Sequence, residues 1–378
     1  MTPLAFTIEP TYSGFSDQLM QFNAFYKLGL HLGYRYRHTP FVSERSAGRD
    51  ISLAGAATDI HDFIGINRYF SAPGEPGETL TIDLSDQRLA EWQVDSLDAL
   101  AERIDAIVKA APGASLVRFQ LDGERKNLFG LIQEAIPEFQ DGLDLPGIYA
   151  DARTRSPCAS MHRKGALKLL VHVRQGDTSV LQTPWGSVMP IWGARADRFH
   201  EYPSFADIPS ARLQFQVPEY RRFLDALLDR LGRPDASILL FSDGSARAFT
   251  QVENNLAKLA WSSEQIQQFR ESRANYDTRQ FACFAEPGDV QLHVGEDPAT
   301  LPQLVDVALG SDIVIASSQQ RMIPKLVANL GRKDSPKVIV LYKQERPDNC
   351  DIVHADHERF IYVDIANPDF DEVLRRLL

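Results

Sequence analysis

Hydrophobic positions in the second half of the chain fall into short apolar runs that alternate with helical patterns. The runs predict buried strands at residues 167–173, 237–241, 290–294, 312–316, 337–342 and 360–363. Apolar residues spaced three or four apart predict helices at 218–231, 245–257, 300–309, 320–330 and 369–377. Strands that alternate with helices in this way indicate a parallel sheet covered by helices on both faces.

The first half repeats this pattern less regularly. Strands are expected at 4–8, 79–84 and 115–119, and helices at 17–32 and 97–110. Ser16 is expected to cap the first helix and Gly33 to end it. The segment 144–164 is rich in Pro, Arg, Ser and Gly and has no clean periodicity, which favours a domain boundary there. We therefore expect an N-terminal α/β domain at residues 1–160 and a C-terminal one at 161–378.

Composition narrows the class of protein. A chain of 378 residues suits two cores better than one, and its contents of hydrophobic and charged residues are ordinary for a globular protein. A net charge of −11 with no basic run argues against a nucleic-acid partner. Met1–Pro10 lacks the pattern of a secretory signal, and no run approaches the roughly 20 apolar residues of a transmembrane helix. With three scattered cysteines, a cytoplasmic protein with reduced thiols is expected.

The first candidate for chemistry is the turn that ends the strand within Leu169–Asp177. It places His172, Arg174 and Asp177 at the carboxyl end of a predicted parallel strand, where open α/β sheets bind ligands. The guanidinium of Arg174 can donate to two phosphate oxygens at once. The alternative is an ordinary strand whose arginine makes a surface ion pair.

A second turn follows the run Asp312–Ala316 and begins with Ser317, Ser318 and Gln319, just before a predicted helix. Serine hydroxyls beside a helix N-terminus form a cradle for anions, because the free N–H groups and the helix dipole both favour negative charge. The alternative is a capped helix without a ligand.

A third run, Ser237–Phe241, places Asp243 at the carboxyl end of its strand. One carboxylate can accept two parallel hydrogen bonds from the N1–H and the exocyclic amine of guanine. The alternative is a capping role for Asp243 at the helix that starts near Ser245. Because all three turns follow parallel strands, they lie on one edge of the sheet and together predict one nucleotide site.

These residues also resemble a known family. His172-Val173-Arg174-Gln175-Gly176-Asp177 resembles the His-x-Arg-Arg-x-Asp motif of GDP-fucose-dependent fucosyltransferases, which include the α1,2-, α1,6-, protein O- and rhizobial nodulation enzymes. The segment from Gly14 to Leu19 resembles the N-terminal glycine loop of that superfamily. Ser242-Asp243 resembles its Ser-Asp-Asp segment, and Asp312 to Gln319 its closing Ser-Ser-Gln motif.

The resemblance implies two facing Rossmann-like domains of GT-B type, with the nucleotide on the C-terminal one. It implies that Arg174 contacts the β-phosphate and that His172 and Asp243 recognise guanine or its ribose. It also implies that the diphosphate is held by Ser317, Ser318 and Gln319. On the other domain, the resemblance implies that the sugar and the acceptor are faced by Gly14, Ser16, Asp17 and Gln18.

Three positions depart from the family pattern. Gln175 replaces the second arginine of the motif, and Gly244 stands where a second aspartate is common. Ser16 and Asp17 replace the usual Gly-Asn or Gly-Cys.

The expected reaction is the inverting, metal-independent transfer of fucose from GDP-fucose to a hydroxyl of a glycan or glycoconjugate. No Asp-x-Asp pair lies at a strand end, so Arg174 and the helix N-terminus at Ser318 would stabilise the leaving diphosphate. Asp17 or Asp177 would act as the base, although Asp177 better suits a turn-stabilising role in which its carboxylate accepts backbone N–H groups. No cofactor and no metal are expected beyond the donor.

Other readings stay open at this point. They are transfer from another donor such as GDP-mannose or a UDP-sugar, a non-catalytic nucleotide- or glycan-binding protein, and another phosphate-handling enzyme. The absence of a GxxxxGK[ST] sequence argues against a P-loop. Trp185 and Trp192, in an insertion rich in Pro and Gly, suit either stacking on a sugar ring or anchoring a core.

Overall fold

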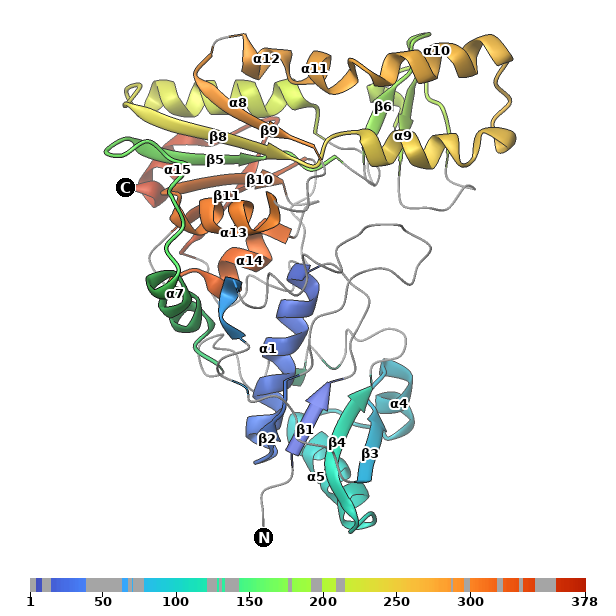
Figure 1. Cartoon of the computed structure of the whole chain (residues 1–378), viewed down its shortest axis with the longest axis vertical. Helices are drawn as coiled ribbons and strands as arrows, with labels where there is room; N and C mark the ends of the chain where they lie inside the picture. The colour runs from blue at the N-terminus through green and yellow to red at the C-terminus, as the bar shows by residue number, and fades with distance from the viewer. Residues whose placement is uncertain are drawn as a thin grey trace. The chain divides into compact units, whose positions relative to one another are not determined.

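The computed structural model of the chain describes residues 5–8, 15–38, 63–66, 70, 78–120, 128, 131–132, 143–175, 179–191, 199–208, 215–286, 288–295, 300–317, 322–332, 336–343 and 358–378. Residue contacts divide them into two compact units. One unit holds the described residues of Met1–Ala159 together with Lys325–Arg332. The other holds those of Ser160–Pro324, Lys333–Cys350 and His357–Leu378. Figure 1 shows the elements of both.

The first unit contains a parallel four-stranded sheet of order β2-β1-β4-β3. Its strands are β1 (Ala5–Ile8), β2 (Arg35–Tyr36), β3 (Glu78–Asp83) and β4 (Ala114–Gln120). Its helices include α1 (Phe15–His31), α4 (Asp86–Glu91), α5 (Leu97–Lys109) and α7 (Leu145–Arg155).

Helix α1 packs closely on β1. Its predicted apolar stripe is buried, as shown by Leu19, Phe22, Phe25 and Leu28. Any side chain at Gly29 would collide with the ring of Phe6, so glycine permits the close approach. The helix begins at Phe15, so the prediction that Ser16 precedes and caps it is wrong, whereas Gly33 follows its end with a φ of +70° as expected.

Helix α7 lies in the segment for which no regular element was predicted. Asp144 accepts a hydrogen bond from Gly147 N–H at 2.9 Å, and a proline occupies the first turn, so the start is a well-formed cap. The buried face consists of Leu145, Ile148, Tyr149 and Ala152. Pro146, Gly147 and Asp151 stand between these positions in the sequence and obscure the helical spacing.

The second unit contains a parallel six-stranded sheet of order β12-β11-β10-β5-β8-β9. Its strands are β5 (Leu167–His172), β8 (Ala236–Ser242), β9 (Val290–Val294), β10 (Ile313–Ser317), β11 (Lys337–Tyr342) and β12 (Phe360–Asp364). If they are numbered along the chain, the order reads 6-5-4-1-2-3, which is doubly wound. The α/β class with two Rossmann-like units is therefore confirmed.

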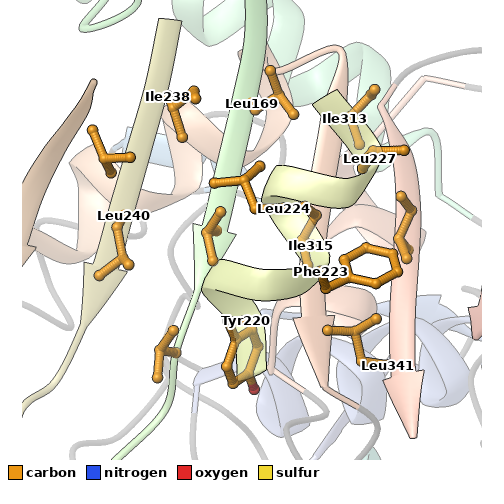
Figure 2. Packing of buried hydrophobic residues seen from close by; sticks show 14 of the residues in the cluster. Leu169, Tyr220, Phe223, Leu224, Leu227, Ile238, Leu240, Ile313, Ile315 and Leu341 are labelled. Atoms are coloured by element: carbon orange, nitrogen blue, oxygen red, sulfur yellow. The ribbon is translucent and has the colours of Figure 1, made fainter. Parts of the chain in front are cut away.

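Helix α8 (Val217–Arg230) covers one face of this sheet. It buries Tyr220, Phe223, Leu224 and Leu227, whose helical spacing matches the prediction. Figure 2 shows these side chains lying over alternate residues of the strands, including Leu169, Ile315 and Leu341. The remaining helices of the unit outside the group described next are α12 (Ala282–Ala285), α13 (Thr300–Gly310) and α15 (Phe370–Leu377). Helix α14 (Met322–Leu330) begins in this unit, and its residues from Lys325 onward belong to the first unit.

A smaller group of elements leaves the sheet at the carboxyl ends of β5 and β8 (Figure 1). We call this group the satellite. It comprises the antiparallel hairpin of β6 (Val180–Gln182) and β7 (Val188–Pro190) with α9 (Ala246–Glu253), α10 (Ser263–Arg273) and α11 (Tyr276–Gln280). Two single-turn 3-10 helices, Phe205–Asp207 and Leu256–Lys258, lie in its connecting segments. The satellite has its own hydrophobic core.

Trp185 belongs to the satellite, and its contacts favour the anchoring role. Its ring lies edge-on to Trp261 with centroids 4.9 Å apart, and both indoles pack against the satellite core. Both indole N–H groups donate to Glu201. Trp192 lies outside the described residues.

Candidate functional site

The doubly wound sheet has one position where the strand order reverses, between β5 and β10. From β5 the chain continues to one side through β8 and β9, and from β10 to the other through β11 and β12. Connections that diverge in this way leave a crevice outside the carboxyl ends of the two central strands. Arg174 lies just after β5, and Ser317 is the last residue of β10.

The turn after β5 is fixed on both sides of Arg174. The N–H of Val173 donates to the carbonyl of Phe241 at 2.9 Å, which extends the pairing with β8. The N–H of Gln175 donates to Oδ1 of Asp243 at 2.6 Å. The half-buried Arg174 therefore extends from a backbone that is held at both neighbours. His172, the last residue of β5, is buried.

The turn after β8 is organised by a residue that the sequence analysis did not single out. Both carboxylate oxygens of Asp277, on α11, lie 3.1 and 3.2 Å from the N–H of Ser245. Asp277 thus takes the position at the start of α9 that had been considered for Asp243. Asp243 instead ties the two turns together through Gln175.

The structure gives a reason for glycine at position 244. Its φ is +67°, and a Cβ there would lie 2.8 Å from Oδ2 of Asp277. The position therefore requires glycine for its backbone conformation and for the space that the carboxylate occupies.

Gln175 is buried, and its amide Nε2 donates to Oε1 of Gln280 on α11. Gln175, which stands where the motif that the sequence resembles has its second arginine, thus contacts the satellite. A neutral amide suits this buried position, because an arginine there would bring a charge that burial penalises.

Ser317 ends β10 with its hydroxyl enclosed in the protein. The hydroxyl of Tyr220, from α8, is also fully buried, and the two groups approach each other without reaching hydrogen-bonding geometry. Burial raises the pKa of Tyr220, and the neighbouring Ser317 hydroxyl partly opposes the rise.

The helices that begin at the carboxyl edge of this sheet have different partners at their positive N-terminal ends. In α8, Glu219 accepts from the N–H of Gln216 at 2.7 Å and pairs with Lys343, which follows β11, at 2.8 Å. In α9 the carboxylate of Asp277 fills the same place. Internal carboxylates therefore already complement the positive ends of these two dipoles. Helix α14 begins five residues beyond the end of β10 (322 against 317), and β10 is one of the two central strands at the reversal of the strand order.

The other predicted site residues stand as follows. Gln18 lies on α1 and is buried. Ser16 and Asp17 belong to the first turn of α1, and their side chains are outside the described part of the structure. Gly14, Asp177, Ser318 and Gln319 lie outside the described residues. The structure thus brings Arg174 and Asp243 to one edge of the sheet with His172 and Ser317, and their assignments to a nucleotide stay predictions.

The described residues contain no group of three or more His, Cys, Asp or Glu side chains arranged to hold a metal ion. None of their helices has the length and apolar content needed to cross a bilayer.

Comparison with known proteins gives low similarity. No protein-family model and no curated protein matches the chain. A mutant of Arabidopsis thaliana FUT1 in complex with GDP is 11% identical with a TM-score of 0.37, over 92% of this chain and 71% of that one. The glycotransferase of kitacinnamycin is 11% identical with a TM-score of 0.33, over 100% and 90% of the two chains.

A UDP-forming α,α-trehalose-phosphate synthase from Burkholderia vietnamiensis is 12% identical with a TM-score of 0.30, over 100% of this chain and 92% of that one. At these TM-scores the similarities assign no function to the chain, so its function is argued from its own residues.

Proposed function

We propose that the chain is a glycosyltransferase that transfers fucose from GDP-fucose to a hydroxyl of a glycan or glycoconjugate. The observation that carries this proposal is the position of Arg174 at the reversal of the strand order, on a backbone tied to β8 through Val173 and Gln175. A guanidinium carried by a fixed backbone at the ligand-binding edge of a doubly wound sheet suits a diphosphate, because it can donate to two oxygens in parallel.

The chemistry of transfer explains why this arrangement would accelerate the reaction. Cleavage of the bond between sugar C1 and the diphosphate oxygen leaves negative charge on GDP and positive character on the sugar. A preorganised cation stabilises that developing charge with little reorganisation. Arg174 is assigned this role, and the N-terminus of α14, after β10, is assigned a second share of it.

Asp243 is assigned to guanine. A carboxylate can accept the N1–H and the amine of the base in parallel, and the position of Asp243 is set by its bond from the Gln175 N–H to Oδ1. His172 is assigned to the same nucleoside. The base that deprotonates the acceptor hydroxyl is assigned to Asp17 or Asp177.

The decisive experiment is a donor screen that measures nucleotide release from GDP-fucose, GDP-mannose and UDP-glucose, together with calorimetry using GDP, UDP and CDP. We expect GDP to bind most tightly and GDP-fucose to be turned over, also in excess EDTA. Binding of GDP without turnover of any donor would favour a non-catalytic binder, and strict metal dependence would end the metal-independent mechanism.

Arg174→Ala should abolish turnover, and Arg163→Ala is its matched control. Arg163 is also an arginine of the second unit, but it bonds Asp235 and the carbonyl of Ala236 at the amino end of β8. Equal activity of the two variants would contradict the role of Arg174.

A further inference from the structure

Helix α11 contributes side chains to three segments that are distant along the chain. Gln280 contacts the turn after β5, Asp277 contacts the turn after β8, and Tyr276 contacts strand β6. The first two of these turns carry Arg174 and Asp243. One short helix of the satellite therefore contacts both of the turns that form the candidate site.

The hydroxyl of Tyr276 is held by three hydrogen bonds and anchors the side chain of Gln280. It accepts from the N–H of Gln182 at 2.7 Å and from Nε2 of Gln280 at 2.7 Å, and it donates to the carbonyl of Val180 at 3.4 Å. A carbonyl only accepts, so the single hydroxyl proton is directed to Val180 and Gln280 must act as donor. The side chain of Tyr276 is buried.

The same donor-to-acceptor direction continues along the side chains to the candidate site. Because Gln280 donates through Nε2, its Oε1 faces Gln175, and Gln175 must donate through its own Nε2. The backbone N–H of Gln175 meanwhile donates to Asp243. Removal of Gln280 would leave a buried donor of Gln175 without its acceptor, which is unfavourable in a low-dielectric interior.

Asp277 fixes the second turn by a different means. Its carboxylate lies at the N-terminus of α9 and accepts the N–H of Ser245 with both oxygens. The negative charge complements the helix dipole. Asp277 also lies against Gly244, so the turn that carries Asp243 is confined by the same helix.

We propose that α11 is the positioning element of the candidate site and that Gln280 and Tyr276 act as positioning residues for Arg174. They do not touch the reacting atoms. They hold the turn after β5 by a directional chain of side-chain hydrogen bonds anchored on the β6–β7 hairpin. The benefit to a sugar donor rests on the proposed function, whereas the positioning itself does not.

The first test measures amide hydrogen exchange of residues 173–175 in the full chain for wild type, Gln280→Leu and Tyr276→Phe. We expect exchange at Gln175 to accelerate about tenfold in both variants, because the loss of one net hydrogen bond corresponds to roughly that factor. Gln267→Leu is the matched control, since Gln267 is an exposed satellite glutamine that bonds Glu271. Unchanged exchange in both variants would overturn the proposal, and Tyr276→Phe keeps it testable if Gln280→Leu does not fold.

The second test measures the Kd for GDP by calorimetry. We expect Gln280→Leu to weaken GDP binding about five- to tenfold while Gln267→Leu leaves it unchanged. If wild type binds no GDP, the proposed function fails, and the exchange experiment still decides the role of α11. If wild type and Gln280→Leu bind GDP equally well, the positioning of Arg174 by α11 is refuted.

Discussion

The substitution Gly244→Ala tests the geometry of the turn after β8. Glycine has a φ of +67° there, and alanine in this left-handed region costs about 1 kcal/mol. The new Cβ would also lie 2.8 Å from Oδ2 of Asp277, so the carboxylate must move away. That movement weakens its bond to the Ser245 N–H, and a hydrogen bond to a charged group contributes about 1.5–3 kcal/mol. The expected loss in free energy of unfolding is therefore about 2–4 kcal/mol.

Gly232→Ala provides a matched control. Gly232 follows α8 with a φ of +77°, and a Cβ there would meet no atom within 4 Å. This substitution carries the backbone cost alone, so we expect a loss of about 1 kcal/mol.

Thermal unfolding followed by calorimetry measures the difference between the two variants. For domains of roughly 150–250 residues, each kcal/mol lowers Tm by about 2–4 °C, so Gly244→Ala should unfold several degrees below Gly232→Ala. A double variant, Gly244→Ala with Asp277→Ala, should lose less stability than the sum of its single losses, because the clash disappears with the carboxylate. Equal losses for the two alanine variants, or strict additivity in the double variant, would refute this account.

Three further predictions concern a buried ion pair, a buried histidine and the arginine of the candidate site. Glu219→Gln should lower the free energy of unfolding by about 1–2 kcal/mol, because it leaves Lys343 uncompensated in a mostly buried pair. The double variant Glu219→Gln with Lys343→Met should lose less than the sum of the two single losses, and urea unfolding measures all three variants. Burial lowers the pKa of His162 below 6.5 in the folded protein, so the unfolded chain binds more protons than the folded one as the pH falls through that value. Stability should therefore decline from pH 7 towards pH 5. His162→Gln should flatten this profile of Tm against pH. Arg174→Lys should reduce kcat/KM for GDP-fucose by about 10- to 100-fold, because an ammonium cannot donate in parallel to two phosphate oxygens; undiminished turnover would count against the assigned role.

Sequence periodicity predicted most of the second unit well. Apolar runs identified β5, β10 and β11 to within one residue, because strands buried on both faces require near-continuous hydrophobic sequence. Helix α10 was missed, since it is polar on most of its surface and buries only Phe269. Helix α7 was missed because Pro146, Gly147 and Asp151 separate the members of its short apolar face in the sequence.

The same contrast applies to the candidate site. The order of strands and helices implied that the turns carrying Arg174 and Asp243 share one sheet edge, and the structure places both turns there in contact. The importance of Asp277 and Gln280 had no signal in the sequence. Both lie on a five-residue helix without an apolar stripe, and their partners are 32 and 105 positions away in the chain.

The sequence by itself determined the alternation of strands and helices, and with it the edge of the sheet on which the polar turns lie. Those features follow from local periodicity and from the parallel direction of the strands, which neighbouring residues encode. Only the tertiary structure decided that Gln175 bonds Gln280 and that Gly244 makes room for Asp277. Such contacts depend on where separate segments meet in space, and no local pattern of hydrophobic and polar residues specifies them.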